Sequence, residues 1–468
     1  MLYQSTRGCA PHIDFRSATL AGLAPDGGLY LPQNWPRFSE ADIADLAGCD
    51  YAETAARVLA PFVGDCLSGA ELRDLTRAAY GAFSHDAVTP LVQLNERNWL
   101  LELFHGPTLA FKDVALQLLG HLFERFLPGT NTHLTIVGAT SGDTGSAAIN
   151  AVANRAQISI VMLHPKGRVS DVQRRQMTTV LAENVHNVAI DGSFDDAQAM
   201  VKRMFADELV TGQRTLSAVN SINWARLAAQ VVYYFYAAVR LGAPQRQVAF
   251  SVPTGNFGDV FAGHVAAQVG LPIARLIVAT NVNDILHRAL STGDYSASMV
   301  VPTATPSMDI QVSSNFERLL FDVGGRDGAA LAAQMRGFEA ARTMQLTNSQ
   351  RTSAARLMTS ARIDGEAMGQ AMLWAWDHAG QLIDPHTAVA LSAAISAARD
   401  SMLDPAIPIV TLATAHPAKF GDAVMAATGQ NSALPARLGN LFDREERCTH
   451  LPGDYGAVRD FVLAATAS

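Results

Sequence analysis

The sequence predicts a doubly wound α/β fold with mainly parallel sheets. Apolar runs of strand length recur between longer helical stretches, and their spacing leaves room for crossover helices. This alternation is typical of parallel sheets that are covered by helices on both faces. The runs that predict strands are 134–137, 158–163, 188–190, 248–252, 276–279 and 407–412.

The chain of 468 residues is longer than one compact core usually holds, so we expect more than one domain. Residues 1–92 mix helical patterns with polar turns and are predicted to form a small N-terminal α/β cap domain. Two larger domains are predicted to follow, at 93–225 and 226–468. The second contains a helical insertion near 325–375, where Ala, Arg, Met and Gln predominate and strand signals are few.

Composition narrows the classes of function. Hydrophobic residues make up 49% of the chain and charged residues 17%, which predicts a folded protein with a large core. The net charge of −8 disfavours binding to nucleic acid or to an anionic membrane. The four cysteines are scattered, and no secretory or membrane-spanning apolar run is present, so we expect a cytoplasmic location. The histidines lack metal-ligand spacing, and no catalytic metal is predicted.

Lysine is rare in this chain. Of the 35 basic residues only four are lysines, at positions 112, 166, 202 and 419. An arginine guanidinium stays protonated and cannot act as an amine nucleophile, whereas a lysine amine can. The four lysines are therefore candidates for chemistry that arginine cannot perform, with chance survival or packing as the alternative.

A first glycine-rich loop, 138–146, follows the predicted strand 134–137 and precedes an alanine-rich helix. Small residues let a backbone approach a ligand closely, and hydroxyl and N–H groups at a helix N-terminus favour an anion. The loop lacks the Gly-Lys-Ser/Thr of a P-loop, so a nucleoside triphosphate is disfavoured. The alternative interpretation is an ordinary N-capped turn.

A second glycine-rich loop, 253–259, follows the predicted strand 248–252 in the same way. Its backbone N–H groups are suited to holding a phosphate. Two anion-binding loops in one chain suggest a ligand with two anionic ends, or a phosphorylated cofactor beside an anionic substrate.

Lys112 lies in the segment 105–113, after an apolar and aromatic approach. Partial burial lowers the pKa of a lysine from about 10.4 and favours the neutral amine, which can form an imine with an aldehyde. An imine-forming lysine together with a phosphate loop is what pyridoxal phosphate requires. The alternative for Lys112 is a solvated charge at the start of a helix.

The loops described above and the further segments 5–8, 26–30, 220–226, 308–315, 385–387 and 413–420 form a set of sequence blocks in a fixed order. Taken together, these blocks resemble the threonine synthase family, pyridoxal-phosphate enzymes of fold type II (tryptophan synthase β-like). The resemblance runs nearly from end to end and implies two doubly wound domains with the cofactor between them, plus a small N-terminal domain. It also implies conversion of O-phospho-L-homoserine and water into L-threonine and phosphate, by a monomer rather than a dimer. The matching blocks are 5–8, 26–30, 105–113, 140–145, 220–226, 253–259, 308–315, 385–387 and 413–420.

The resemblance also assigns roles to residues. It makes Lys112 the catalytic residue and the imine-forming residue, and Thr414 the hydroxyl that faces the pyridine nitrogen. Asp143 would meet the cofactor's 3′-oxygen, where related dehydratases commonly have Asn. The other cofactor residues implied are Phe111, Gly255, Asn256, Phe257 and Gly258. The implied substrate residues are Ser141, Gly142 and Thr144 for the carboxylate, and Asn220, Ser221 and Arg226 for the phosphate. Lys166 and Lys419 receive no assigned role.

Two alternatives to this function remain open at the level of sequence. One is a threonine synthase-like phospholyase or dehydratase, which releases 2-oxobutyrate and ammonia. The other is a pyridoxal-phosphate-binding protein without catalytic activity, which the intact lysine and anion loops disfavour.

Overall fold

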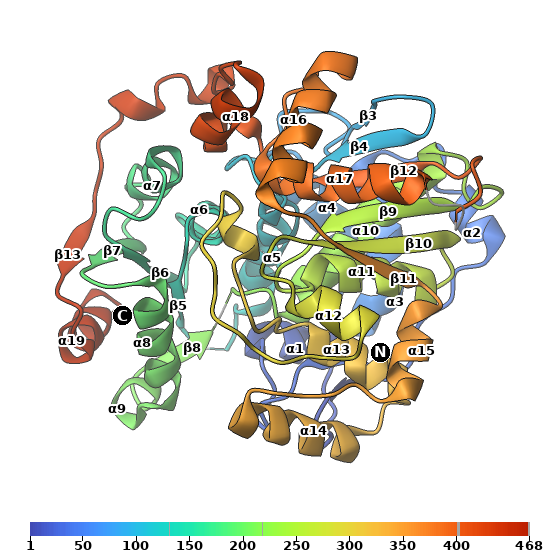
Figure 1. The fold of residues 1–468 in the computed structure, drawn as a ribbon. Coiled ribbons are helices and arrows are strands. Elements are labelled where there is room, and N and C mark those ends of the chain that lie inside the picture. The colour runs from blue at the N-terminus through green and yellow to red at the C-terminus, as the bar shows by residue number, and fades with distance from the viewer. Residues whose placement is uncertain (131, 218, 400–402, 467–468) are drawn as a thin grey trace.

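The computed structural model describes residues 1–130, 132–217, 219–399 and 403–466. Their strands form three sheets, of two, six and five strands. Figure 1 shows the five-stranded and six-stranded sheets on opposite sides of the molecule, with helices α5 (Lys112–Phe126) and α6 (Asp143–Val152) between them. This arrangement confirms the predicted α/β fold with two parallel-sheet units.

The six-stranded sheet has the order β11-β10-β9-β12-β4-β3, and only the edge strand β3 is antiparallel to its neighbour. The central strands β9 and β12 are buried along their whole length, as expected for parallel strands covered on both faces. The predicted strands at 248–252, 276–279 and 407–412 are confirmed here. The strands are β3 (Leu91–Gln93), β4 (Asn98–Glu102), β9 (Val248–Pro253), β10 (Ile273–Thr280), β11 (Met358–Arg362) and β12 (Ile409–Ala413).

The five-stranded sheet is parallel throughout and has the order β13-β7-β6-β5-β8. It contains the other three predicted strands, at 134–137, 158–163 and 188–190. Its strands are β5 (Leu134–Ala139), β6 (Ile158–Pro165), β7 (Val185–Ile190), β8 (Thr215–Ser217) and β13 (Thr449–Leu451).

Strand pairing crosses the predicted boundary between the segments 93–225 and 226–468. β4 lies in the first segment but pairs with β12 of the second. β13 lies in the second segment but pairs with β7 of the first. Neighbours in a sheet are chosen by packing in space, so composition along the chain does not reveal such exchanges.

The segment 325–375 is mainly helical, as predicted. It contains α14 (Gly328–Ala341), α15 (Asn348–Ala355) and most of α16 (Gly365–Ala379). It also contains β11, which the sequence analysis did not predict. β11 reads Met-Thr-Ser-Ala-Arg and lies at the edge of its sheet, where burial does not demand a continuous apolar run.

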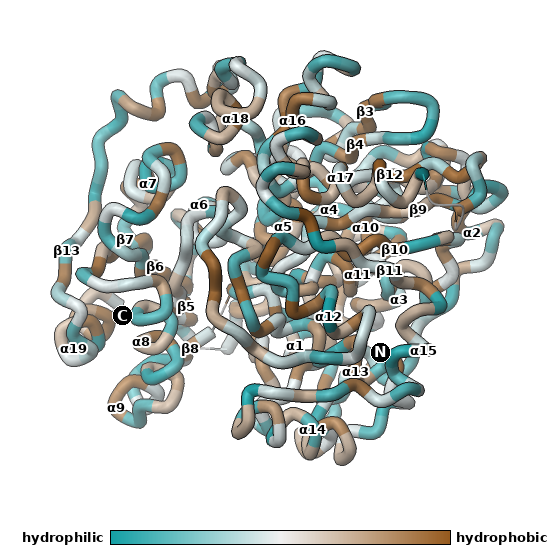
Figure 2. The backbone as a smooth tube through the Cα atoms, viewed as in Figure 1, coloured by the Kyte–Doolittle hydropathy of each residue, from teal (hydrophilic) through white to brown (hydrophobic). Residues whose placement is uncertain are grey.

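Helix α10 (Trp224–Arg240) lies at the centre of the core, because every residue from Trp224 to Val239 is buried. A helix that is buried on all sides belongs inside a large protein. In Figure 2, hydrophobic stretches concentrate in the interior segments around α5 and α10. The remaining helices are α1 (Phe15–Ala21), α2 (Glu40–Ala44), α3 (Tyr51–Val63), α4 (Gly69–Tyr80), α7 (Asp171–Thr178), α8 (Phe194–Ala206), α9 (Glu208–Thr211), α11 (Gly258–Gln268), α12 (Ile285–Ser291), α13 (Phe316–Val323), α17 (Pro385–Arg399), α18 (Gly421–Thr428) and α19 (Tyr455–Ala465).

The N-terminal unit consists of α1 to α4 and the antiparallel strands β1 (Tyr3–Ser5) and β2 (Tyr30–Pro32). The Tyr3 hydroxyl donates to the Phe62 carbonyl at 2.7 Å and accepts from the Trp224 indole N–H at 3.0 Å. Tyr3 thus joins α3 to α10, and the N-terminal unit shares the main hydrophobic core.

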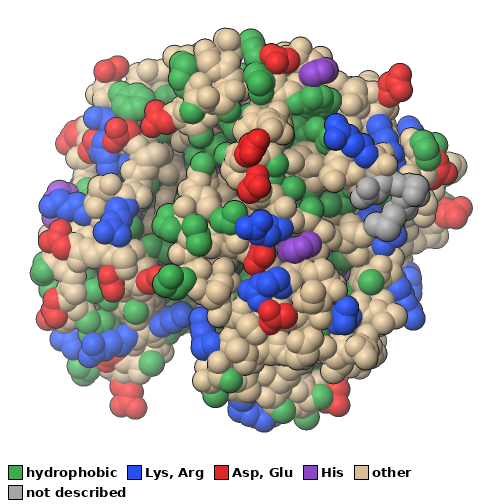
Figure 3. Space-filling view, viewed as in Figure 1, with side chains coloured by type: hydrophobic (Ala, Val, Ile, Leu, Met, Phe, Trp, Pro, Cys, Tyr) green, Lys and Arg blue, Asp and Glu red, His purple; other side chains and the backbone are tan. Residues whose placement is uncertain are grey.

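On the face shown in Figure 3, acidic and basic side chains are interspersed. None of the helices in the described ranges combines the length and the hydropathy that a bilayer crossing needs.

Candidate active site

Lys112 is buried at the start of α5, beside the carboxyl edge of the six-stranded sheet. The Phe111 backbone N–H donates to the Thr414 carbonyl at 2.8 Å, and Thr414 directly follows β12. The Lys112 Nζ atom lies 3.4 Å from Asp143 Oδ2 and 4.6 Å from the centre of the Phe111 ring. The fold therefore brings the adjacent residues Phe111 and Lys112 together with Asp143 and Thr414, which are distant in the sequence.

The surroundings of Lys112 favour its neutral form. Burial lowers the pKa of the amine, the Asp143 carboxylate opposes this, and the positive charges of Lys419 and Arg226 add to the lowering. The net direction is downward. A neutral amine is the form that attacks an aldehyde or accepts a proton.

Asp143 is held by the first glycine-rich loop, between β5 and α6. Gly142 has φ 137°, which side-chain-bearing residues rarely adopt, and a Cβ there would lie 2.5 Å from Gln173 Cδ. The glycine thus lets Gln173 approach and donate to Asp143 Oδ1 at 2.8 Å. Thr140 Oγ1 accepts from the N–H groups of Gly142, at 2.9 Å, and Gly145, at 2.8 Å. The loop and the carboxylate are therefore rigidly placed.

Lys419 is a second lysine at this site, and the sequence analysis assigned it no role. Its Nζ lies 2.6 Å from Asp143 Oδ1 and 2.9 Å from the Thr108 carbonyl, and its side chain is fully buried. Burial alone would raise the pKa of Asp143, but Lys419 and Lys112, with the Gln173 hydrogen bond, outweigh burial and hold that pKa below its ordinary range. Asp143 is consequently an ionised carboxylate between two lysines.

The chain's four lysines fall into two buried and two surface residues. Lys112 and Lys419 are buried at the site. Lys166 is more than half exposed and faces Asp191 at 3.9 Å, and Lys202 is exposed on α8. The scarcity of lysine was thus the signal in the sequence that could have identified Lys419.

The second glycine-rich loop joins β9 to the N-terminus of α11. Phe257 has φ 61° and no side chain caps the helix. Among the residues that the structure describes, the backbone N–H groups of Gly255, Asn256 and Phe257 donate no hydrogen bond within the chain. A Cβ at Gly255 would lie 2.5 Å from the Ser307 carbonyl oxygen. Free N–H groups at a helix N-terminus fit a phosphate, as the sequence analysis expected.

The segment 308–315 donates hydrogen bonds to the backbone carbonyls of this loop. Ser313 Oγ donates to the Gly255 carbonyl at 2.7 Å. Asn315 Nδ2 donates to the carbonyls of Asn256, at 3.1 Å, and Ser221, at 3.0 Å. Ser221, which the sequence analysis assigned to the substrate phosphate, therefore lies against the loop assigned to the cofactor phosphate.

Arg226 is a buried guanidinium on α10 that has no carboxylate partner among the described residues. Its Nη1 donates to the Val219 carbonyl at 2.8 Å, and its Nε has no partner. Burial lowers its pKa to about 10. A buried cation with an unused donor is costly on its own and suits an incoming anion.

The other predicted substrate residues lie at helix N-termini. Ser141 and Thr144 are half-buried around the start of α6, next to the buried Gly142. Asn220 is exposed and precedes α10. In the described part of the chain no hydrogen bond or ion pair joins these side chains to Lys112, so their assignments stay predictions.

Asp259, the last residue of the second loop and part of the first turn of α11, is a buried carboxyl that was not singled out from the sequence. The hydroxyls of Tyr233 and Tyr234 both donate to its Oδ1, while its Oδ2 has no partner among the described residues. Burial raises the pKa of Asp259 to about 7, against the lowering effect of these hydrogen bonds and of Lys112. The second glycine-rich loop thus ends in a buried carboxyl whose pKa is about 7.

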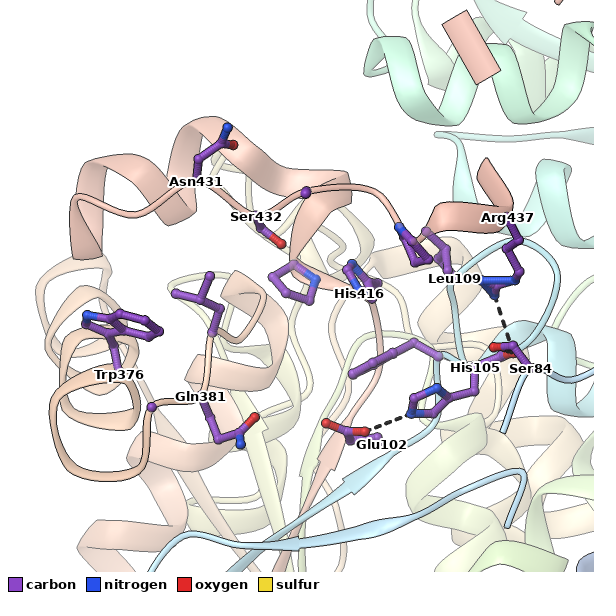
Figure 4. A pocket seen from close by; sticks show the side chains of 16 residues that line it. Ser84, Glu102, His105, Leu109, Trp376, Gln381, His416, Asn431, Ser432 and Arg437 are labelled. Atoms are coloured by element: carbon purple, nitrogen blue, oxygen red, sulfur yellow. Dashed lines mark hydrogen bonds and ion pairs between the residues drawn. The ribbon is translucent and has the colours of Figure 1, made fainter. Parts of the chain in front are cut away.

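A pocket of about 530 Å³ adjoins the segments that carry the two buried lysines. Leu109 and His416 line it (Figure 4), and His416 N–H donates to the Leu109 carbonyl at 3.1 Å. His105 Nε2 and Glu102 Oε2 lie 2.7 Å apart in the pocket. Burial lowers the pKa of His416 to about 4, so this ring is neutral at neutral pH. The pocket lies next to the loop that precedes Lys112.

Pyridoxal phosphate fits these residues. Lys112 supplies a buried amine of lowered pKa, and the second loop supplies free N–H groups for a phosphate. Thr414, at the end of β12, supplies the hydroxyl predicted to face the ring nitrogen. Within the described ranges, no group of three or more His, Cys, Asp or Glu side chains is arranged to hold a metal ion.

Comparison with models of protein families also indicates pyridoxal phosphate. The model described as "Pyridoxal-phosphate dependent enzyme" matches residues 83–354. "Threonine synthase N terminus" matches residues 2–80, and "Threonine synthase, C-terminal" matches residues 387–462. The three matches cover all three units of the fold.

Individual proteins agree over the full length. A threonine synthase of Pseudomonas aeruginosa is 52% identical over 463 residues, which cover 99% of this chain and 98% of the relative. The crystal structure of a PLP-bound threonine synthase from Brucella melitensis matches with a TM-score of 0.96 at 49% identity and covers 100% of both chains. The threonine synthase structure from yeast matches with a TM-score of 0.92 at 37% identity, over 99% of this chain and 98% of that one. This chain therefore belongs to the threonine synthase family of pyridoxal-phosphate-dependent enzymes.

Proposed function

We propose that the chain is a threonine synthase, which converts O-phospho-L-homoserine and water into L-threonine and phosphate. The observation that carries the proposal is the buried guanidinium of Arg226, which has no carboxylate partner among the described residues and a free Nε, and whose positive charge lowers the pKa of Lys112. If the second glycine-rich loop binds the cofactor phosphate, Arg226 offers a separate position for the phosphate of a substrate. An enzyme that binds pyridoxal phosphate and a phosphorylated amino acid needs these two separate phosphate positions.

Lys112 is the proposed base. Pyridoxal phosphate, when bound, supplies an aldehyde that joins the substrate amine and a conjugated ring that takes up the electrons of the broken Cα–H bond. The Lys112 amine, displaced from that aldehyde, accepts the Cα proton and later returns a proton to the same carbon. Its burial keeps a neutral amine available for the first of these transfers.

The first loop is proposed to hold the amino-acid end of the substrate. Ser141, Gly142 and Thr144 surround the N-terminus of α6, where N–H groups favour a carboxylate. Asp143 is proposed to face the cofactor's 3′-oxygen, with its orientation set by Gln173. Thr414 is a neutral hydroxyl at the ring nitrogen, so it does not force that nitrogen to be protonated.

The phosphate end of the substrate is assigned to Asn220, Ser221 and Arg226. A guanidinium binds a phosphate through two parallel N–H donors and stabilises the charge on it as it leaves from Cγ. For phosphate to leave with the electrons of the Cγ–O bond, a proton must be removed from Cβ; Cγ then gains a proton to become the methyl group, and water adds its hydroxyl at Cβ while a proton returns to Cα, which gives threonine. Because Arg226 is buried, its charge acts with little screening by water.

A direct assay tests this proposal. The full-length holoenzyme is incubated with O-phospho-L-homoserine, and threonine, 2-oxobutyrate and phosphate are measured together. Threonine and phosphate in equal amounts support the proposal, whereas 2-oxobutyrate as main product identifies a phospholyase. Lys112→Ala should abolish both products and the imine absorbance, while Lys166→Ala, at an exposed lysine, should retain them.

The proposal includes a monomeric enzyme in the cytoplasm. The four cysteines are free thiols, as suits a reducing compartment. Analytical ultracentrifugation of the holoenzyme at several concentrations tests this, because a monomer keeps the molecular mass of one chain at every concentration.

A further inference from the structure

Lys419 and Lys112 share one carboxylate. Lys419 Nζ lies 2.6 Å from Asp143 Oδ1, and Lys112 Nζ lies 3.4 Å from Asp143 Oδ2. Each oxygen of Asp143 therefore faces one lysine, and Lys419 is the closer of the two. The Asp143 side chain is only 5% exposed, so water contributes little to balancing its charge.

The fold holds both lysines firmly. They lie on chain segments that are hydrogen-bonded to each other, through Phe111 N–H to the Thr414 carbonyl at 2.8 Å and His416 N–H to the Leu109 carbonyl at 3.1 Å. Lys419 lies three residues after His416, and Lys112 lies three residues after Leu109. The spacing between the two amines is thus set by backbone pairing.

We propose that Lys419 is a positioning residue of the site: its ammonium pairs with the Asp143 carboxylate, so that Lys112 can remain a neutral amine. The proposal rests on the role of Lys112 in the proposed function. With Lys419 present, the charge of Asp143 is already balanced, and Lys112 needs no proton to complete the pair. Without Lys419, Lys112 is the one lysine or arginine that lies within 4.0 Å of Asp143 in the described part of the chain. A buried carboxylate with a single such partner holds that partner in its charged form.

Other charged groups face the two lysines. Arg226 adds to the lowering of the Lys112 pKa, and Lys112 in turn lowers the pKa of Asp259. Lys419 lowers the pKa of Asp113, which burial raises to about 6, and it also contributes to the lowered pKa of His416. None of these groups approaches Asp143 as closely as Lys419 does. The effect of removing Lys419 should therefore fall on Lys112.

The replacement Lys419→Met tests the positioning role of Lys419 and leaves the neighbouring hydrogen bonds largely in place. The Thr108 carbonyl, which loses the Lys419 donor, still accepts from Gln176 Nε2 at 3.0 Å. The full-length chain is freed of cofactor, and the rate of imine formation with added pyridoxal phosphate is followed by visible absorbance from pH 6 to pH 10. Borohydride reduction and peptide mapping locate the imine at Lys112.

In Lys419→Met, the pH midpoint for imine formation should rise by one to two units, which lowers the rate at pH 7 by about 10-fold to 100-fold. The double variant Lys419→Met with Asp143→Asn removes both charges of the pair and should return the midpoint to near the parent value. Lys166→Met, at a surface lysine, should leave it unchanged.

Distinct results overturn the inference and the proposed function. A folded Lys419→Met with an unshifted midpoint, or a double variant that keeps the raised midpoint, overturns the role of Lys419. If the parent chain forms no imine at Lys112, the proposed function itself fails. A merely structural role for Lys419 would lower the yield of folded protein without moving the midpoint, and the unchanged midpoint would count against the inference.

Discussion

The Thr6 hydroxyl donates a hydrogen bond of 2.6 Å to the Glu317 carboxylate, which lies 311 residues further along the chain. Arg7 Nη2 reaches the same carboxylate at 3.2 Å. Glu317 lies in α13, directly after the segment 308–315 that supports the phosphate loop. The N-terminal unit thereby contacts α13, which directly follows the segment that supports the loop proposed to hold the cofactor phosphate.

Glu317→Ala should lower the free energy of unfolding by about 2–4 kcal/mol, because it leaves Arg7 and Thr6 without their buried acceptor. Glu339 also pairs with Arg7, at 2.8 Å, but its side chain is 53% exposed. Glu339→Ala should therefore cost at most about 0.5 kcal/mol. Urea unfolding of both variants measures the difference, and equal losses would contradict the assigned coupling.

Arg226→Met should separate stability from function. Removal of an unpaired buried charge should raise the unfolding free energy by about 1–2 kcal/mol in phosphate-free buffer. The same change should retain bound cofactor and raise KM for O-phospho-L-homoserine by about 100-fold, from the loss of roughly 3 kcal/mol of charged hydrogen bonding. Loss of the cofactor instead would show that the two phosphate positions are not separate.

Arg318 is the matched control for Arg226. It is also fully buried, but its guanidinium donates to the Tyr30 carbonyl at 2.9 Å and to the Ile222 carbonyl at 2.6 Å. Arg318→Met should therefore destabilise the chain by about 2–4 kcal/mol, because several buried acceptors lose their donor. Urea unfolding and cofactor absorbance report on both arginines.

Asp259→Asn should change how stability depends on pH. The pKa of Asp259 is about 7 in the folded chain, against about 3.9 in an unfolded one. Between these values the folded state binds the extra proton, so this carboxyl makes the parent chain less stable as pH rises from 4 to 7. The asparagine stays neutral, and the variant's advantage should grow from near zero at pH 4 to about 4 kcal/mol above pH 7.

Urea unfolding of the cofactor-free chain at pH 4, 5.5, 7 and 8 measures this difference. Asp113, whose pKa burial raises to about 6, acts in the same direction in both proteins and cancels. An advantage that stays constant over this range would be inconsistent with the raised pKa of Asp259.

Gly255→Ala should weaken the affinity for pyridoxal phosphate by at least 10-fold, because the new Cβ would lie 2.5 Å from the Ser307 carbonyl oxygen and force the loop to move. Gly369→Ala is the control, since nothing lies within 4 Å of the corresponding Cβ in α16. It should stabilise the helix by about 0.5–1 kcal/mol and leave cofactor binding unchanged. Equilibrium dialysis against the cofactor compares the two.

Local patterns in the sequence were enough to predict the central strands and the two loops. β9 is buried along its whole length and β5 over its first four residues, so their sequences are mostly apolar and are recognisable without knowledge of their neighbours. The same is true of the glycine-rich loops, because close backbone approach demands small residues. The edge strand β11 has no such requirement, and its polar sequence left it unpredicted.

The sequence by itself determined the fold class, the imine-forming candidate Lys112 and the phosphate loop, since each depends on residues that are close together in the chain. Only the tertiary structure decided which charges meet. Asp143 stands between Lys112 and Lys419, and Arg226 is buried with no carboxylate partner among the residues that the structure describes. The strength of a charge–charge interaction depends on distance and burial in space, and residues 143 and 419 become neighbours only when the two sheets pack together.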